Sequence, residues 1–172
     1  MTAMADFDRP FGSTVFCDDI RQEVADKHSL MGVYQGILVL PELPAAIPKL
    51  GFFITIFEPR DIALARDFPI GVRILFPGNL DQPAMAAELA PFSAETKASL
   101  RRQQAPDDAD TTPLVRLPLI LMMVPCYLPT AGIVRVRADY KGDTIKLGSI
   151  RIIAKTELDR LAAEYATALP SP

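Results

Sequence analysis

GIVRVRADYKGDTIKLGSIRIIA, residues 132–154, alternates apolar and polar side chains along two runs that a short Lys-Gly-Asp segment separates. Val134 and Val136 alternate with Arg135 and Arg137 in the first run. A period of two residues places successive side chains on opposite faces of a β-strand. The segment therefore predicts a β-hairpin with one apolar face and one basic face.

Runs of apolar, β-branched and aromatic residues recur throughout the chain, with Gly, Pro and Asp between them, as is typical of strands. A half-apolar sheet face must be buried against a second layer. The expected fold is therefore all-β, a two-layer antiparallel β-sandwich of the immunoglobulin-like or C2-like type. Pro118, inside one run, predicts an edge strand or a bulge, because proline cannot donate to the ladder. The seven predicted strands are Thr14–Val24, His28–Leu40, Leu50–Phe57, Ile70–Phe76, Val115–Val124, Gly132–Tyr140 and Thr144–Ala154.

Two segments depart from the strand pattern and predict helices. The long polar connection 80–112 contains Ser93–Gln104, a short helix with Ser93 as its N-cap and two arginines in its last turn. Thr156-Glu-Leu-Asp159 has the form of a capping box at the start of a C-terminal helix within 156–169, from about Glu157 to Ala168. We expect its apolar stripe to lie on the sheets or on a partner. The stripe consists of Leu158, Leu161, Ala162, Tyr165 and Leu169.

The chain has 172 residues, 49% of them hydrophobic, and a net charge of -3. A chain of this length can form a core without metal or disulfide, so we expect a single domain over residues 1–172, with 1–12 as an N-terminal arm. The pI of about 5.2 argues against nucleic acid as a partner. We expect a cytoplasmic protein with no transmembrane segment, because neither a secretory signal nor a long apolar helix is present. Cys17 and Cys126 lack metal or redox spacing and are expected to be free, buried thiols.

The first two predicted strands, Thr14–Val24 and His28–Leu40, form a hairpin whose predicted turn is Ala25-Asp26-Lys27. The predicted pairs are Val24 with His28, Asp18 with Tyr34, and Cys17 with Gln35. Asp18 and Tyr34 then form a structural polar pair on the core face, because a buried carboxylate needs a hydrogen-bond donor. The predicted core face carries Phe16, Ile20, Val24, Leu30, Tyr34 and Leu38. The opposite face carries Cys17, Asp19, Arg21, Glu23, Ser29, Met31 and Gln35.

The opening segments FCDDIRQE, residues 16–23, and KHSLMGVY, residues 27–34, carry a resemblance to a known family. They resemble the start of a family of small uncharacterised proteins of bacterial genomes and their phages. The specific similarity covers roughly these two segments. Residues 132–152, with a glycine between two predicted strands, are also similar. The resemblance implies a β-sandwich of unknown function. It implies no catalytic or ligand-binding residue.

No residue pattern predicts catalysis. A serine or cysteine mechanism would require His28, the single histidine of the chain, and the predicted hairpin separates it from Cys17 by most of a strand. Nucleophile-elbow, phosphate-loop, dinucleotide-binding and zinc-protease motifs are absent from the sequence. Asp107, Asp108 and Asp110 lack the glycine-spaced pattern of a calcium loop, so a solvated acidic linker is expected there. We therefore predict no catalytic residue, no metal and no cofactor.

The basic face of the last hairpin is the candidate docking patch. Arg135 and Arg137 project from one strand, and Lys146 lies on the next. A solvated sheet surface is the simplest interpretation, and a docking patch for an acidic partner is the functional one. The leading hypothesis is a non-enzymatic binding or assembly module that contacts a protein partner or a second copy, through the latter's Asp19 and Glu23 face. The alternatives are a calcium- or lipid-dependent surface module and an enzyme of unrecognised class.

Overall fold

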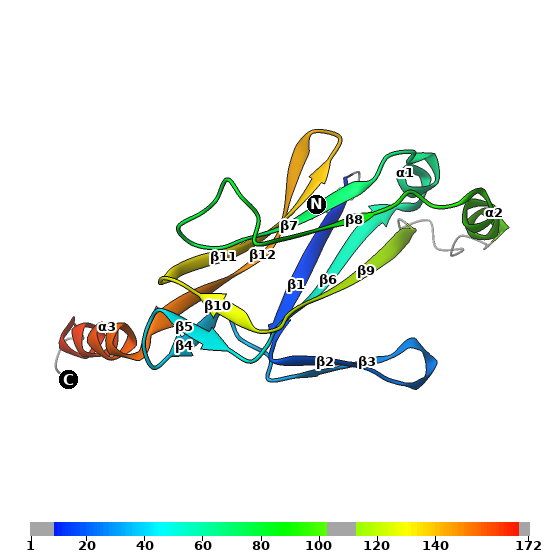
Figure 1. Ribbon diagram of the computed structural model, residues 1–172. Helices are drawn as coiled ribbons and strands as arrows, with labels where there is room; N and C mark the ends of the chain where they lie inside the picture. The colour runs from blue at the N-terminus through cyan, green and yellow to red at the C-terminus, as the bar shows by residue number, and fades with distance from the viewer. Residues whose placement is uncertain (1–8, 103–112, 169–172) are drawn as a thin grey trace, which may run out of the picture.

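The computed structural model of the protein consists mainly of β-strands (Figure 1). It describes residues 9–102 and 113–168, and the all-β expectation is confirmed there, with helices confined to short segments and the C-terminal end. No helix in these two ranges is long and apolar enough to cross a membrane. The elements in chain order are β1 (Phe11–Cys17), β2 (Asp19–Gln22), η1 (Val24–Asp26), β3 (His28–Met31), β4 (Ile37–Leu40), β5 (Ala45–Ile47), β6 (Leu50–Pro59), α1 (Arg60–Ala65), β7 (Ile70–Leu75), β8 (Met85–Leu89), α2 (Ala94–Arg102), β9 (Leu114–Met123), β10 (Cys126–Leu128), β11 (Gly132–Tyr140), β12 (Asp143–Ala154) and α3 (Lys155–Ala168).

Two sheets contain most of the strands. The three-stranded sheet has the order β1-β6-β9, with both pairs antiparallel. The five-stranded sheet has the order β4-β12-β11-β7-β8. Its β4 and β12 run parallel, with Ile37 opposite Arg151, so the expectation of purely antiparallel pairing is wrong at this edge. The two strands are far apart in the chain, so no hairpin turn sets their relative direction.

One hydrophobic core contains side chains from both sheets. Phe52 and Ile54 of β6 lie in it with no exposed surface, and the buried side chains of β11 alternate in the same way. Strands β1 and β12 lie close together. A Cβ atom added at Gly12 of β1 would overlap the Leu147 side chain of β12. Gly148, with a φ of +146°, lies directly against β1. Other members of the core include Phe16, Leu40, Val72, Val134 and Ile150.

Five predicted strands correspond to single strands of the structure, namely β6, β7, β9, β11 and β12. The edge position of β9 confirms the interpretation of Pro118. The first two predicted strands are each divided, one into β1 and β2 and the other into β3 and β4. The segment between β3 and β4 contains Gly32 and Gly36, whose φ angles are +65° and +89°. Strands β5, β8 and β10 have only three to five residues, too few for the alternation to indicate them.

The opening hairpin is shifted from its predicted register. Gln22, rather than Val24, pairs with His28. The turn occupies η1, one residue earlier than predicted, because Ala25 and Asp26 adopt φ angles of +60° and +55°. Turns with positive φ at two consecutive residues usually contain glycine or asparagine. Ala25-Asp26 has neither, so the sequence does not indicate this turn.

Three side chains consequently lie elsewhere than predicted. Val24, expected in the core, is 88% exposed. Cys17 belongs to β1 and pairs with Gly51 instead of Gln35, and its full burial contradicts its predicted position on the outer face of the hairpin but confirms the predicted buried thiol. Asp18, expected on the core face, is exposed because it lies at the bend between β1 and β2, outside both ladders.

Helix α2 confirms the predicted short helix in the polar connection. The Ser93 Oγ accepts a hydrogen bond from the Thr96 N–H at 3.1 Å, as an N-cap does. Arg101 and Arg102 occupy the last turn of the helix, as expected.

Helix α3 confirms the predicted C-terminal helix, which ends at Ala168 as expected but begins earlier than predicted. It begins at Lys155, so Thr156 lies inside the helix and the capping-box interpretation is wrong. Leu158 of the predicted stripe is half-buried, whereas Leu161 and Tyr165 are 36% and 71% exposed, so the sheets cover the stripe only near the start of the helix. Leu169 lies outside the described residues.

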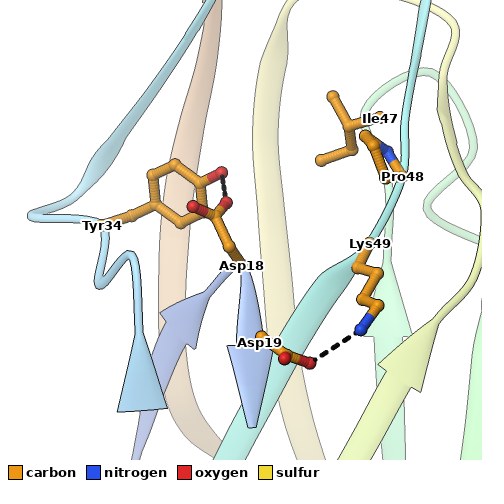
Figure 2. Close-up of a pocket in the computed structure, with 6 residues that line it drawn as sticks. All are labelled: Asp18, Asp19, Tyr34, Ile47, Pro48 and Lys49. Atoms are coloured by element: carbon orange, nitrogen blue, oxygen red, sulfur yellow. Dashed lines mark hydrogen bonds and ion pairs between the residues drawn. The ribbon is translucent and has the colours of Figure 1, made fainter.

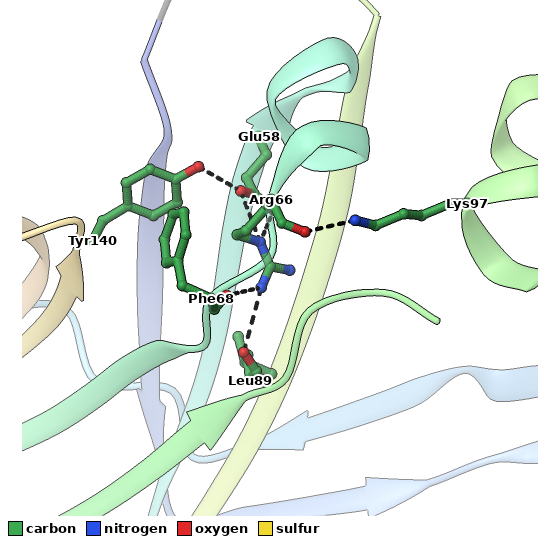
Figure 3. A network of polar contacts seen from close by, with 6 residues as sticks. All are labelled: Glu58, Arg66, Phe68, Leu89, Lys97 and Tyr140. Atoms are coloured by element: carbon green, nitrogen blue, oxygen red, sulfur yellow. Dashed lines mark hydrogen bonds and ion pairs between the residues drawn. The ribbon is translucent and has the colours of Figure 1, made fainter. Parts of the chain in front are cut away.

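A buried ion pair connects the two sheets (Figure 3). Arg66, which follows α1, donates from Nε to the carboxylate of Glu58 on β6 at 3.2 Å, and both side chains have no exposed surface. Tyr140 of β11 donates its hydroxyl to the same carboxylate at 2.9 Å. Burial, together with this hydrogen bond, raises the pKa of Tyr140 above its ordinary value. A strand from each sheet is thereby joined inside the core.

The same arginine anchors the neighbouring segments (Figure 3). Its Nη1 donates to the carbonyl oxygens of Phe68 at 3.0 Å and of Leu89, at the end of β8, at 3.5 Å. Lys97 of α2 donates from Nζ to the Arg66 carbonyl oxygen at 2.7 Å. The guanidinium group lies 5.5 Å from the centre of the Phe92 ring. Arg66 therefore contacts α2 through its backbone carbonyl and both sheets through its side chain.

We predict that Arg66→Ala lowers the free energy of unfolding by about 3–5 kcal/mol, because it leaves the Glu58 carboxylate buried without its cation. Urea denaturation measures this change. Lys155→Ala, which removes an exposed ion pair with Asp159, is the control and should cost less than about 1 kcal/mol. The double variant Glu58→Leu/Arg66→Met should be more stable than Arg66→Ala, because no buried charge remains. Equal effects of Arg66→Ala and the control would contradict the prediction.

Candidate functional site

The five-stranded sheet assembles basic side chains from three strands on its outward side. Arg137 of β11 pairs with Arg73 of β7 on one side and with Lys146 of β12 on the other. Arg135 projects from the same side of β11. Side chains at directly paired positions are neighbours, with Cβ atoms about 4.5–5.5 Å apart. We call these four residues the basic face.

The members of the basic face differ in how their charges are neutralised. Arg73 forms an ion pair with Asp139 at 2.6 Å. Arg135 and Arg137 donate only to backbone carbonyl oxygens, and within the described residues neither they nor Lys146 have a carboxylate oxygen within 4.0 Å. Burial lowers the pKa of Arg137, and the charge of Arg135 lowers it further. The face therefore holds three unneutralised cations close together.

The other candidate pair, Asp18 and Tyr34, borders an open pocket of about 430 Å³ (Figure 2). The Tyr34 hydroxyl donates to the Asp18 carboxylate, although this carboxylate is exposed rather than buried. Burial, followed by this hydrogen bond, raises the pKa of Tyr34. The pocket is lined by Asp18, Asp19, Tyr34, Ile47, Pro48 and Lys49.

The lysine of this pocket is already paired with one of its carboxylates. Lys49 donates to Asp19 at 3.0 Å and Arg21 donates to it at 3.3 Å. These bonds, the one from Lys49 first, lower the pKa of Asp19. Tyr34 keeps its proton, and Asp18 accepts a hydrogen bond from it. The pocket therefore offers no unpaired cation to an anionic ligand, and the Asp18 carboxylate is its one charge without an ion pair among the described residues.

The two thiols and the histidine do not form a catalytic group. Cys17 and Cys126 are free and fully buried. Burial raises the pKa of both thiols, that of Cys126 to about 11, which disfavours the nucleophilic thiolate. His28 packs its ring against Phe53, with 5.5 Å between the centres. Asp107, Asp108 and Asp110 lie outside the described residues. Among the residues that the structure describes, no group of three or more His, Cys, Asp or Glu side chains could hold a metal ion.

Comparisons with models of protein families, with curated proteins and with solved structures gave no match. The family resemblance of the opening motif stays a prediction. The structure adds Arg73 to the residues that the sequence indicated for the basic face. The alternation in 70–75 is sufficient to place Arg73 on the outward side of its own strand. It cannot show that this strand pairs with β11, more than 60 residues later.

We predict that the bend at Asp18 depends on Gly32 more than on the carboxylate. Gly32→Ala should lower the free energy of unfolding by about 1–2 kcal/mol, because its φ of +65° is strained for other residues and the added Cβ would overlap Asp18. Asp18→Ala should change it by less than about 1 kcal/mol, because the residue is exposed. Urea denaturation of both variants provides the measurement. A larger loss for Asp18→Ala than for Gly32→Ala would contradict this prediction.

Proposed function

We propose that the protein is a non-enzymatic binding module whose basic face docks an acidic surface of another protein. The observation that carries the proposal is the presence of three cations, Arg135, Arg137 and Lys146, with no carboxylate partner among the described residues. Like charges held close together repel one another, and an acidic partner relieves that repulsion. Arginine suits this role because its planar group can bind both oxygens of a carboxylate.

The proposed architecture is a two-layer β-sandwich of the immunoglobulin-like or C2-like kind. Its support is the single core to which both sheets contribute. In such an arrangement the outer face of each sheet is free for binding. The free thiols Cys17 and Cys126 support a reducing, cytoplasmic location.

A partner other than a second copy is favoured by the charges of the opening hairpin. If the partner were a second copy, its Asp19 and Glu23 would have to bind the basic face. Asp19 is already bound by Lys49 and Arg21 of its own chain. Glu23 is exposed next to the turn. Of these two carboxylates only Glu23 has no cation partner among the described residues, so the Asp19 and Glu23 face is a poor complement to three unneutralised cations.

We predict that the double variant Arg135→Glu/Arg137→Glu weakens binding of poly-L-glutamate, a probe for an acidic protein surface, by more than about tenfold. Each opposed charge pair at an interface contributes on the order of 1 kcal/mol or more. Isothermal titration calorimetry measures the affinity. The matched control is Arg101→Glu/Arg102→Glu on α2, which makes the same change in net charge away from the basic face. Binding to the unmodified protein should weaken from about 0.1 M to 1 M salt, as the Debye length falls from about 10 Å to 3 Å.

The same variants distinguish the other partners. Equal losses in the double variant and its control would show that net charge, and not the basic face, determines binding. Binding to phosphatidylserine vesicles without binding to poly-L-glutamate would assign the face to lipid headgroups and overturn the proposal. A dimer of the unmodified protein that the double variant abolishes would identify the acidic partner as a second copy.

A further inference from the structure

A second open cleft, of about 480 Å³, involves a different part of the molecule. The hairpin β2-β3 extends from the end of β1 as a separate two-stranded ribbon beside the three-stranded sheet (Figure 1). The cleft lies between this hairpin and the outer face of β6 and β9, and its volume is within the range of about 300–1,000 Å³ that small-molecule sites occupy. It is lined by Asp26, Lys27, His28, Leu30, Phe53 and Arg116.

The packing of the hairpin on the three-stranded sheet defines this cleft. Ile20 approaches Gly51, where an added Cβ atom would lie 3.1 Å from the Ile20 side chain, so the base of the hairpin is packed against β6. His28, paired with Gln22 near the tip, lies over Phe53. The hairpin is thus closed against the sheet at its base, and the cleft lies towards its tip.

Apolar and aromatic groups line one part of the cleft. Phe53 and Leu30 are half-buried, so each presents part of its side chain to the cleft. The His28 ring lies 5.5 Å from the Phe53 ring, with 53° between their planes. The Arg116 guanidinium group lies 5.9 Å from the centre of the same Phe53 ring. An apolar group and a cation are therefore adjacent.

The charges of this cleft are not neutralised internally. Lys27 and Arg116 are exposed, and neither has a carboxylate oxygen within 4.0 Å among residues 9–102 and 113–168. Asp26 is the one acidic residue of the lining. The pocket at Asp18 is the opposite case, since its lysine is already bound to Asp19. Two unpaired cations beside an apolar wall match an anion that carries an apolar group.

We propose that this cleft binds a small anionic ligand, a carboxylate or phosphate monoester joined to an aromatic or other apolar group. Lys27 and Arg116 bind the anionic group by charge-assisted hydrogen bonds. Phe53 and Leu30 contact the apolar group and remove it from water. The site lies on the three-stranded sheet and the opening hairpin, whereas the basic face belongs to the five-stranded sheet, so the two sites are independent.

The test follows the ring protons of His28 by NMR, because it is the single histidine of the chain and gives one set of signals. Phenyl phosphate and benzoate should shift these signals saturably, with dissociation constants below about 1 mM. Inorganic phosphate and benzyl alcohol, which each lack one of the two groups, should bind at least about tenfold more weakly. The two anions distinguish a phosphate from a carboxylate as the preferred ligand.

Lys27→Gln and Arg116→Gln should each weaken phenyl phosphate binding by about tenfold, because each removes one charge-assisted hydrogen bond. Lys49→Gln, at the other pocket, is the matched control and should leave it unchanged. Arg135→Glu/Arg137→Glu should also leave it unchanged, so failure of this proposal is distinguishable from failure of the proposed function. Circular dichroism melting confirms that each variant is folded. Absence of a saturable shift, or equal affinity in Lys27→Gln, Arg116→Gln and the control, would overturn the proposal.

Discussion

The ion pair between Arg66 and Glu58 is the constraint on which the arrangement of the two sheets depends. Both charges are removed from water, and that cost is offset only when each is surrounded by partners of good geometry. Those partners come from β6, β8, β11 and the segment after α1, so the pair gains these hydrogen bonds only when all of them are in place, and the Arg66 Nη2 still has no partner among the described residues. One arginine therefore couples local segments to the assembly of the core.

Once the core is closed, the outer faces of the two sheets differ in chemistry. The five-stranded sheet presents Arg135, Arg137 and Lys146 without carboxylate partners in the described part of the chain. The three-stranded sheet instead presents aromatic groups, and the stacked rings of Phe11 and Phe57 lie 5.2 Å apart on it. A charged face and an aromatic face select different ligands, which is why a protein surface is proposed for one and a small amphipathic anion for the other.

Local patterns were sufficient to predict β6, β7, β9, β11 and β12, because an alternating or continuous apolar run bounded by turn residues is a property of each strand alone. It was not sufficient for the opening hairpin. There the register depends on positive φ angles at Ala25 and Asp26, which the side chains do not indicate. The buried pair of Glu58 and Arg66 was equally invisible, since a charged residue in sequence is expected at the surface and only tertiary packing brings the two together. The parallel pairing of β4 with β12 likewise has no local signal.

The candidate sites follow the same division between local and long-range information. Arg135 and Arg137 could be predicted as one surface because they are two residues apart on one strand. Arg73 joins them only through the pairing of β7 with β11, and Arg116 meets Lys27 only because the hairpin lies beside β9. Whether such a cluster is available for binding then depends on its neighbours. Asp19 and Lys49 neutralise each other, whereas Lys27 and Arg116 have no carboxylate oxygen within 4.0 Å in the described chain. Unpaired positive charge, rather than charge density, is therefore the property on which both proposed sites rest.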